Sequence, residues 1–372
     1  MTKLLILFFI SLFLAYQSDR YTQKVTDAGY PYTLWTDKAL VLLIAVLSLF
    51  AGLRTNYNDT AAYINGFNHA PGLWEFLSIA ENRNPFTNPL FYAYQSMLKT
   101  LGFQAQSLIF TTSVFTQTCF VLFFKRYSKN FLFSIFLYFT LGTFCVSLAA
   151  MKQITAMAVL TLGFKYIEQR KWGRYYIVVI AAMLIHTYAL TFAILPFFTT
   201  KTWKHMTYIL IGGTVFVLFN FREVISEFMD EANELGKSLA EYEVFGDHTV
   251  NLFRVLVYVV PPLFSFLFQK WLYRDSSRMD HVLSHMAVIS LCFMLMGTKS
   301  GANMFARMAY YFEIGTIAVL PWLIRKPFEE VSYKYIEKIA LICFFAFFIY
   351  AYGINIRFDE QYEIAKWHLL II

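Results

Sequence analysis

The sequence predicts an all-α, polytopic integral membrane protein with about twelve transmembrane helices, several of them short or broken. Of the 372 residues, 58% are hydrophobic and 20% are aromatic, and the mean hydropathy is +0.51. The basic residues stand in short clusters between apolar runs, as they do in cytoplasmic loops. A soluble chain of this length cannot bury so much apolar surface. We therefore expect residues 1–372 to form a single transmembrane domain.

The apolar segments follow one another with short polar links between them. They cover about 2–17, 38–53, 105–124, 130–148, 152–168, 173–186, 188–199, 206–221, 250–272, 282–298, 304–324 and 336–354. Several fall short of the roughly 20 residues that a full span needs. The first segment lacks a good small-residue cleavage site, so we expect a retained helix rather than a signal peptide. Pro261-Pro262 predicts a kink or a break in its segment.

The distribution of basic residues predicts how the chain is oriented in the membrane. It also predicts whether residues 173–199 form one long helix or a hairpin. A short hairpin there, in place of one long helix, puts every strongly basic loop on the same side of the membrane. The basic residues of these loops are Arg20, Lys24, Lys38, Lys125, Arg126, Lys129, Lys165, Arg170, Lys171, Arg174, Lys201, Lys204, Lys270, Arg274, Arg278, Arg325, Lys326, Lys334 and Lys338. The positive-inside rule makes that side cytoplasmic. We therefore predict the hairpin, with both chain termini outside.

The two sizeable hydrophilic loops then fall on the outer side, at about 54–104 and 222–249. Within the first loop, residues 88–101 are apolar but short, and a crossing there would break the charge pattern. We expect an interfacial or re-entrant helix.

Composition also excludes some functions. The four cysteines lie inside apolar runs without metal-ligand spacing, so we expect small core residues and neither a metal site nor a cofactor. No basic stripe with interleaved aromatic residues occurs, so nucleic acid is not an expected partner.

A few polar residues stand out because they fall on the outer side, at or within apolar helices. They are Arg54, Asp59, Tyr63, Lys152, His186, Arg254, Lys299, Arg307, Tyr311 and Glu313. Arginine in a membrane helix generally faces a polar cavity or a partner, and converging arginine and lysine side chains suit phosphate. The set predicts an outward-facing cationic cavity for a lipid-linked phosphate substrate.

Simpler interpretations remain open for several of these residues. Arg54 and Asp59 could form an interfacial ion pair, and Lys152 could reach the lipid headgroups along its own apolar stem. His186 could be a hydrogen-bonded histidine at the tip of the hairpin. Glu313 could pair with Arg254 or Lys299 for structural reasons alone.

Four short blocks resemble the EpsG-type, Wzy-like family of bacterial polysaccharide polymerases. The first block is Gly52-Leu53-Arg54 with Asp59 and Tyr63. The second is Lys152-Gln153-Ile154-Thr155-Ala156-Met157-Ala158, with Tyr166-Ile167 and Arg170-Lys171 after it. The third runs from Ile180 through His186 to Leu190, and the fourth is Arg307-Met308-Ala309-Tyr310-Tyr311-Phe312, leading to Leu320-Pro321. Two departures are Lys152, where the family usually has arginine, and Tyr188, where it favours a small residue such as serine.

The resemblance implies an enzyme of the bacterial cytoplasmic membrane that joins repeat units carried on undecaprenyl diphosphate at the outer face. It would be a metal-independent glycosyltransferase making exopolysaccharide, capsule or O-antigen. Its implied partners are the lipid-linked oligosaccharide and membrane lipids, with a chain-length regulator left open.

Within this scheme, the catalytic candidates are His186, Asp59 and Arg307. His186 is the preferred general base, because imidazole titrates near neutral pH; Asp59 is the alternative base or orients Arg54. The substrate-binding candidates are Arg54, Lys152, Gln153, Arg254, Lys299, Tyr63 and Tyr311. Arg54 and Arg307 are assigned to the diphosphate, and the two tyrosines to sugar or phosphate.

Two other classes of function remain open. A flippase or exporter of a lipid-linked glycan would also use a cationic cavity, but it should have pseudo-symmetric halves, which the sequence does not show. An acyl- or phosphotransferase acting on envelope glycans would need a donor site that no motif identifies.

Overall fold

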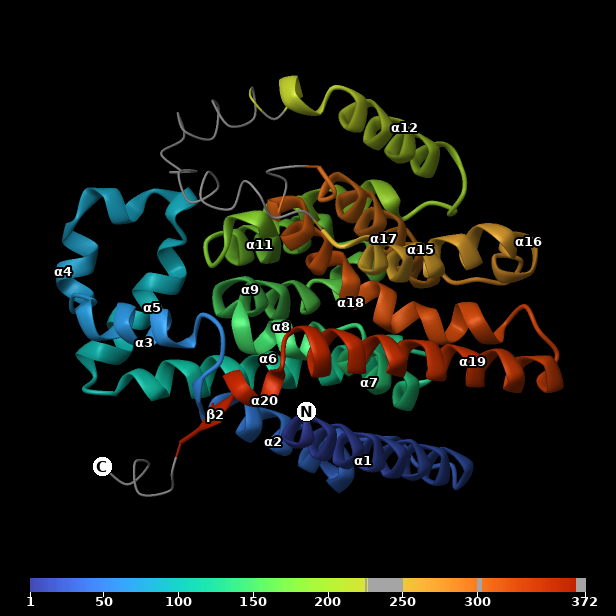
Figure 1. Ribbon diagram of the computed structural model, residues 1–372, viewed down its shortest axis with the longest axis horizontal. Helices are drawn as coiled ribbons and strands as arrows, with labels where there is room; N and C mark the ends of the chain where they lie inside the picture. Colours follow the sequence, from blue (N-terminus) through green and yellow to red (C-terminus); the bar gives the residue numbers. More distant parts are fainter. Residues whose placement is uncertain (225, 227–249, 300–302, 366–372) are drawn as a thin grey trace. The chain divides into compact units, whose positions relative to one another are not determined.

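The computed structural model describes residues 1–224, 226, 250–299 and 303–365, and these residues form a nearly all-helical chain (Figure 1). The predicted all-α fold with several apolar helices is confirmed. The predicted outer loop at 222–249 lies almost wholly outside the described residues. Contacts divide the chain into two compact units. Unit 1 contains residues 1–80, 90–161 and 335–372, and unit 2 contains residues 81–89 and 162–334.

Unit 1 is built mainly from the N-terminal helices and the C-terminal segment. Its elements are α1 (Thr2–Asp27), η1 (Leu34–Thr36), α2 (Lys38–Gly52), β1 (Arg54–Asn56), α3 (Thr60–His69), α4 (Leu73–Ser78), α5 (Pro89–Thr100), α6 (Ala105–Tyr127), α7 (Phe131–Thr140), α8 (Thr143–Ala149), α9 (Met151–Thr161), most of α19 (Glu330–Phe348), η5 (Ile349–Asn355), α20 (Phe358–Gln361) and β2 (Glu363–Ile364). The helices α2 and α6 pack against each other, and α1 packs against α2 and α7. At the start of α1 (blue in Figure 1), the N-terminal amine pairs with Asp359 of α20.

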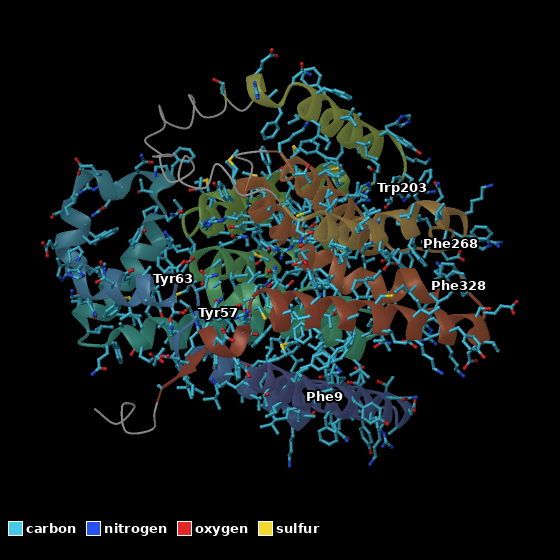
Figure 2. The ribbon with its side chains drawn as sticks, in the orientation of Figure 1. Phe9, Tyr57, Tyr63, Trp203, Phe268 and Phe328 are labelled. Atoms are coloured by element: carbon cyan, nitrogen blue, oxygen red, sulfur yellow. The ribbon has the colours of Figure 1, made fainter. Side chains whose placement is uncertain are left out.

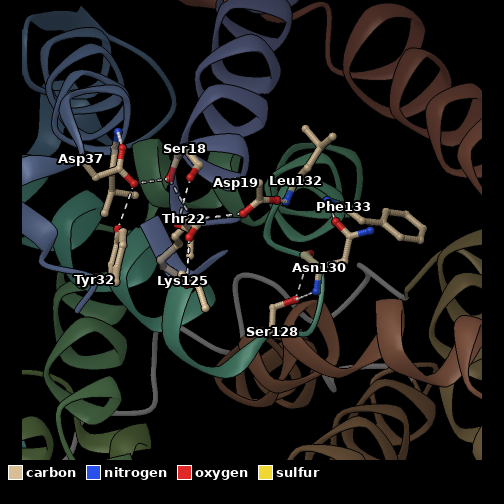
Figure 3. A network of polar contacts seen from close by, with 12 residues as sticks. Ser18, Asp19, Thr22, Tyr32, Asp37, Lys125, Ser128, Asn130, Leu132 and Phe133 are labelled. Carbon is tan, nitrogen blue, oxygen red and sulfur yellow. Dashed lines mark hydrogen bonds and ion pairs between the residues drawn. The ribbon is translucent and has the colours of Figure 1, made fainter. Parts of the chain in front are cut away.

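A buried polar network ties four helices together at one end of unit 1 (Figure 3). Asp37 is fully buried and caps α2 by accepting from the backbone N–H of Leu40. Its other oxygen accepts from the hydroxyls of Ser18 and Tyr32, at 2.7 and 2.9 Å. Lys125, at the end of α6, donates to Ser18. A buried charge is tolerated when it is hydrogen-bonded in this way, so the network fixes how the ends of these helices meet.

The neighbouring Asp19 extends this network to α7. Its carboxylate pairs with Lys125 at 3.1 Å and accepts from the backbone N–H of Leu132. The network lies about 22 Å along the 15-residue α2 from Gly52.

Unit 2 contains η3 (Pro85–Thr87), α10 (Phe164–Glu168), α11 (Trp172–Met183), η4 (Thr187–Phe198), α12 (His205–Phe219), α15 (Leu252–Leu267), α16 (Gln269–Leu272), α17 (Arg278–Met296) and α18 (Asn303–Arg325); η2 (Ala80–Arg83) joins it to unit 1. The helix α17 packs along α18, and Ser290 donates to the carbonyl of Ala309 across the contact. At one end of this unit lie Trp203, Phe268 and Phe328 (Figure 2), the last two with ring centroids 4.9 Å apart.

The predicted hairpin at 173–199 is confirmed as two short helices. The helix α11 ends at Met183, and η4 begins at Thr187 and packs back along it. The hydroxyls of Tyr175 and Tyr176 donate to the carbonyls of Phe192 and Ala193, and these bonds fix the pairing of the two arms.

Two local expectations were wrong. The first helix extends to Asp27, so Arg20 and Lys24 lie on it rather than in a loop. Cys343 is exposed, whereas all four cysteines were expected in the core. Of the kink or break expected at Pro261-Pro262, the break is absent, because α15 continues through both prolines; the kink stays a prediction.

By length and hydropathy, four helices of the described residues are able to cross a membrane: α1, α6, α17 and the run of α19 and η5. The bent pair α7 and α8 makes a fifth when it is counted as one span. Its 54° bend lies at Gly142, whose φ of +93° is unfavourable for residues with a side chain. The prediction of twelve crossings stays a prediction.

Candidate active site

The first block lies where α2 ends against α6. A Cβ atom at Gly52 would meet Phe110 of α6 at 2.8 Å from its ring and 3.1 Å from its Cα. Glycine therefore lets the two helices approach closely just before Arg54. The backbone is held by Gln106, whose side-chain amide donates to the carbonyls of Gly52 and Arg54.

The guanidinium of Arg54 is fully buried inside this junction. It donates to the hydroxyls of Thr60 and Ser113, at 3.2 and 3.1 Å, and to the carbonyl of Ala51. Burial lowers its pKa to about 10, so the group stays positive at neutral pH. Among the described residues it has no carboxylate partner. The ion pair with Asp59, which the sequence left open as a simpler interpretation, is absent from the described residues; Asp59 is exposed, and the neighbouring Thr60 contacts Arg54 instead.

The C-terminal segment covers the same junction. Strand β2 pairs antiparallel with β1, with Arg54 opposite Ile364. Tyr362 donates its hydroxyl to the carbonyl of Phe50 at 2.6 Å and stacks on the Phe50 ring at 4.4 Å. Residues more than 300 positions apart thus pack together at this junction, and we call Tyr362 and β2 the C-terminal lid.

The second block contacts Tyr63 of the first block and, in addition, Tyr92 of α5. The Nζ atom of Lys152 donates to the hydroxyl of Tyr92 at 3.0 Å and lies 5.1 Å from the centre of its ring. The backbone N–H of Lys152 donates to the hydroxyl of Tyr63 at 3.3 Å, and burial raises the pKa of that hydroxyl. Next to Lys152, Gln153 is buried. The structure therefore gathers Tyr63, Lys152 and Tyr92 from α3, α9 and α5.

The third and fourth blocks meet inside unit 2. The Nδ1 atom of His186 lies 2.7 Å from the hydroxyl oxygen of Tyr311, which belongs to a fully buried side chain. His186 is half-buried and extended, between the two arms of the hairpin. The following Thr187 donates to the side-chain oxygen of Asn88, which follows η3, and to the carbonyl of Phe86 within η3. These bonds fix the position of the imidazole relative to α18.

The remaining cations lie on or near α15 and α18. The guanidinium of Arg254 lies 4.9 Å from the ring centre of Tyr310, and Arg307 is half-buried one turn before Tyr310. Lys299 is exposed in the turn after α17.

The buried carboxylate of Glu313 accepts from the hydroxyl of Tyr258 at 2.5 Å. Tyr258 lies one turn after Arg254 on α15. The sequence offered Arg254 or Lys299 as partners of Glu313 and missed Tyr258.

The predicted site residues thus fall into two groups, each within one compact unit. Unit 1 holds Arg54, Asp59, Tyr63, Lys152 and Gln153, and unit 2 holds His186, Arg254, Lys299, Arg307 and Tyr311. A single outward cavity that joins them stays a prediction. In the part of the chain that the structure describes, no three or more His, Cys, Asp or Glu side chains are grouped to hold a metal ion.

Sequence reasoning missed several residues of these groups. Ser113 belongs to a polar stripe with Thr112, Thr116 and Gln117 inside an apolar run, and that stripe was a usable signal. The sequence gives no signal for Tyr362, Tyr92 and Asn88, because only tertiary contacts place them beside the four blocks.

A model of the EpsG family matches residues 38–364, from the first residue of α2 to the last residue of β2. The match includes all four blocks and the strand that covers Arg54, and it confirms the resemblance. No curated protein and no solved structure matches the chain.

Proposed function

The chain belongs to the EpsG family, and on this premise we propose that it polymerises lipid-linked oligosaccharide repeat units at the outer face of the bacterial cytoplasmic membrane. Membership and the apolar helices indicate a membrane-bound, glycosyltransferase-like polymerase of polysaccharides. Undecaprenyl diphosphate as the carrier of donor and acceptor, and the outer face as the place of reaction, belong to the proposal.

The observation that carries the proposal is the contact between His186 and Tyr311. It joins two blocks 125 positions apart in sequence at a hydrogen-bond distance of 2.7 Å. In the tautomer with its proton on Nδ1, this atom donates to the oxygen of Tyr311 and Nε2 carries the basic lone pair. A general base needs this tautomer.

The reaction needs one proton acceptor and several cations. The hydroxyl of the acceptor sugar gives its proton to Nε2 of His186, and its oxygen bonds to the anomeric carbon of the donor. The bond from that carbon to the diphosphate oxygen breaks, and the electron pair leaves with the lipid diphosphate. Arg307 and Arg254 stabilise the charge that builds there, and Lys152 binds the substrate.

Arg54 acts differently in this scheme. Its guanidinium is buried under the C-terminal lid and bonded to hydroxyls and a carbonyl. It reaches the diphosphate only after the lid opens; in the closed state, it holds the first block in place.

The test is the polysaccharide ladder of a deletion strain complemented with variants. His186→Ala and Arg307→Ala should leave single repeat units on the lipid carrier, since loss of a general base costs about 100-fold or more in rate. The matched controls are His69→Ala and Arg325→Ala, at exposed positions, which should restore full ladders.

Two results would count against the proposal. If His186→Ala and Arg307→Ala both make full ladders at normal protein levels, His186 is not the general base and Arg307 does not stabilise the leaving diphosphate. Purified protein that moves lipid-linked units across vesicles without lengthening them would favour a flippase.

A further inference from the structure

A hollow beside the first block has no role in the scheme above. It has a volume of about 420 Å³ and is lined by α3, the end of α5 and the start of α6. All its lining residues belong to unit 1, within the predicted outer loop or directly after it. Ligand sites usually measure about 300–1,000 Å³, so the hollow has the size of a small binding site.

The lining combines side-chain amides, a lysine and aromatic rings. The amides belong to Asn68, Gln104 and Gln106, and Lys99 adds a cation that donates to the carbonyl of Asn68 at 2.7 Å. Amides both donate and accept, which suits sugar hydroxyls, since a hydroxyl also does both. No acidic side chain lines the hollow.

Gln106 links the hollow to the first block. Its amide nitrogen donates to the carbonyls of Gly52 and Arg54. Among the described residues, its side-chain oxygen accepts no hydrogen bond from the protein, so this oxygen can accept one from a ligand hydroxyl.

The backbone presents Phe103 at the rim of the hollow. Gly102 has a φ of +81°, and the N–H groups of Gly102 and Phe103 bond to the carbonyls of Lys99 and Leu98. This is the glycine-based end of a helix, in which the chain turns sharply outward. The Phe103 side chain is 51% exposed as a result, and a flat exposed ring can stack on the apolar face of a sugar.

We propose that this hollow is a glycan subsite, which holds one or two sugar rings of the oligosaccharide substrate away from the reacting bond. The inference rests on the proposed function and adds to it a second place where the enzyme binds the glycan. Weaker binding there shortens the time that a glycan stays on the enzyme, so it should also shorten the polysaccharide product.

The direct test is binding of the soluble repeat-unit oligosaccharide, free of lipid, to the full-length protein in lipid nanodiscs. Saturation-transfer NMR reports which sugar protons lie against the protein. Phe103→Leu should weaken binding about fivefold, because it removes the flat ring but keeps an apolar side chain. Asn68→Ala should weaken it to a similar degree, and Phe103→Tyr should retain it.

The substitution of Phe103 by leucine distinguishes two roles of this residue: contact with a sugar in the subsite, and anchoring of the loop in the membrane. A residue that only anchors the loop in the lipid interface tolerates leucine. The control is Trp74→Leu, an exposed aromatic residue of the same outer loop that does not line the hollow; it should bind as the wild type does. In cells, Phe103→Leu should shift the ladder to shorter products.

Equal binding by the wild type and Phe103→Leu would overturn the subsite, as would absence of binding to the wild type. Either result leaves the polymerase in place as long as the wild type makes ladders and His186→Ala does not. Absence of a ladder from the wild type would instead remove the proposed function.

Discussion

The imidazole of His186 and the hydroxyl of Tyr311 are hydrogen-bonded at 2.7 Å, although one lies at the tip of a hairpin and the other on α18. The bond holds Nδ1 against the hydroxyl of Tyr311 and so fixes the orientation of the imidazole ring. Tyr311 is therefore a positioning residue in the proposed mechanism.

Tyr311→Phe should lower the polymerisation rate about tenfold, since it removes one hydrogen bond that orients the base. It should also change the pH dependence of the rate, which a purely structural change would leave alone. The control is Tyr310→Phe, which keeps the aromatic ring against Arg254. This variant should retain the wild-type polymerisation rate and its pH dependence. Identical pH–rate profiles for Tyr311→Phe and the wild type would contradict the role.

Gly52→Ala should destabilise unit 1 by about 1–3 kcal/mol, because its new methyl group overlaps the ring and backbone of Phe110. Gly66→Ala is the matched control, since a Cβ atom there meets nothing within 4 Å, and it should be neutral or slightly stabilising. Thermal unfolding of the purified variants in detergent measures both. An unchanged midpoint for Gly52→Ala would show that α2 and α6 can separate freely.

Tyr362→Ala should open the lid over Arg54. It removes the stacking on Phe50 and the hydrogen bond to the Phe50 carbonyl, and loss of a buried aromatic side chain costs about 3–5 kcal/mol. Limited proteolysis should then cut the C-terminal segment faster than in the wild type. Tyr335→Ala, at an exposed position, controls for loss of a tyrosine and should digest at the wild-type rate.

Stability at alkaline pH should depend on Tyr32. Burial and the hydrogen bond to Asp37 raise the pKa of its hydroxyl above the ordinary value of 10. Because the folded pKa is raised, the contribution of this group is fully present below pH 10 and is lost as the pH rises toward the folded value. Unfolding midpoints of the wild type and Tyr32→Phe from about pH 8 to about pH 11 check this.

The gap between the two proteins should be constant at lower pH and should shrink above pH 10. Tyr30→Phe, at an exposed position two residues away, should follow the wild type throughout. A gap that stays constant across the range would show that Tyr32 does not titrate with folding.

Several features of the site followed from sequence because they depend on local pattern. The charge bias alone predicted the hairpin at 173–199, and the four blocks predicted the family. The ion pair between Arg54 and Asp59, left open as the simpler interpretation, does not occur among the described residues. Proximity in sequence suggested it, but α3 begins at Thr60 and brings that hydroxyl, rather than the carboxylate, to the guanidinium.

By itself, the sequence determined that this is an all-α membrane protein of the EpsG family, because hydropathy, charge bias and short motifs act along the chain. Only the tertiary structure decided that the C-terminal strand pairs beside Arg54, that His186 meets Tyr311, and that a hollow of about 420 Å³ lies beside Gln106. These depend on contacts between residues far apart in the chain, such as Phe50 with Tyr362. No periodicity encodes such pairings; they follow from how the helices pack and which buried polar groups must find partners.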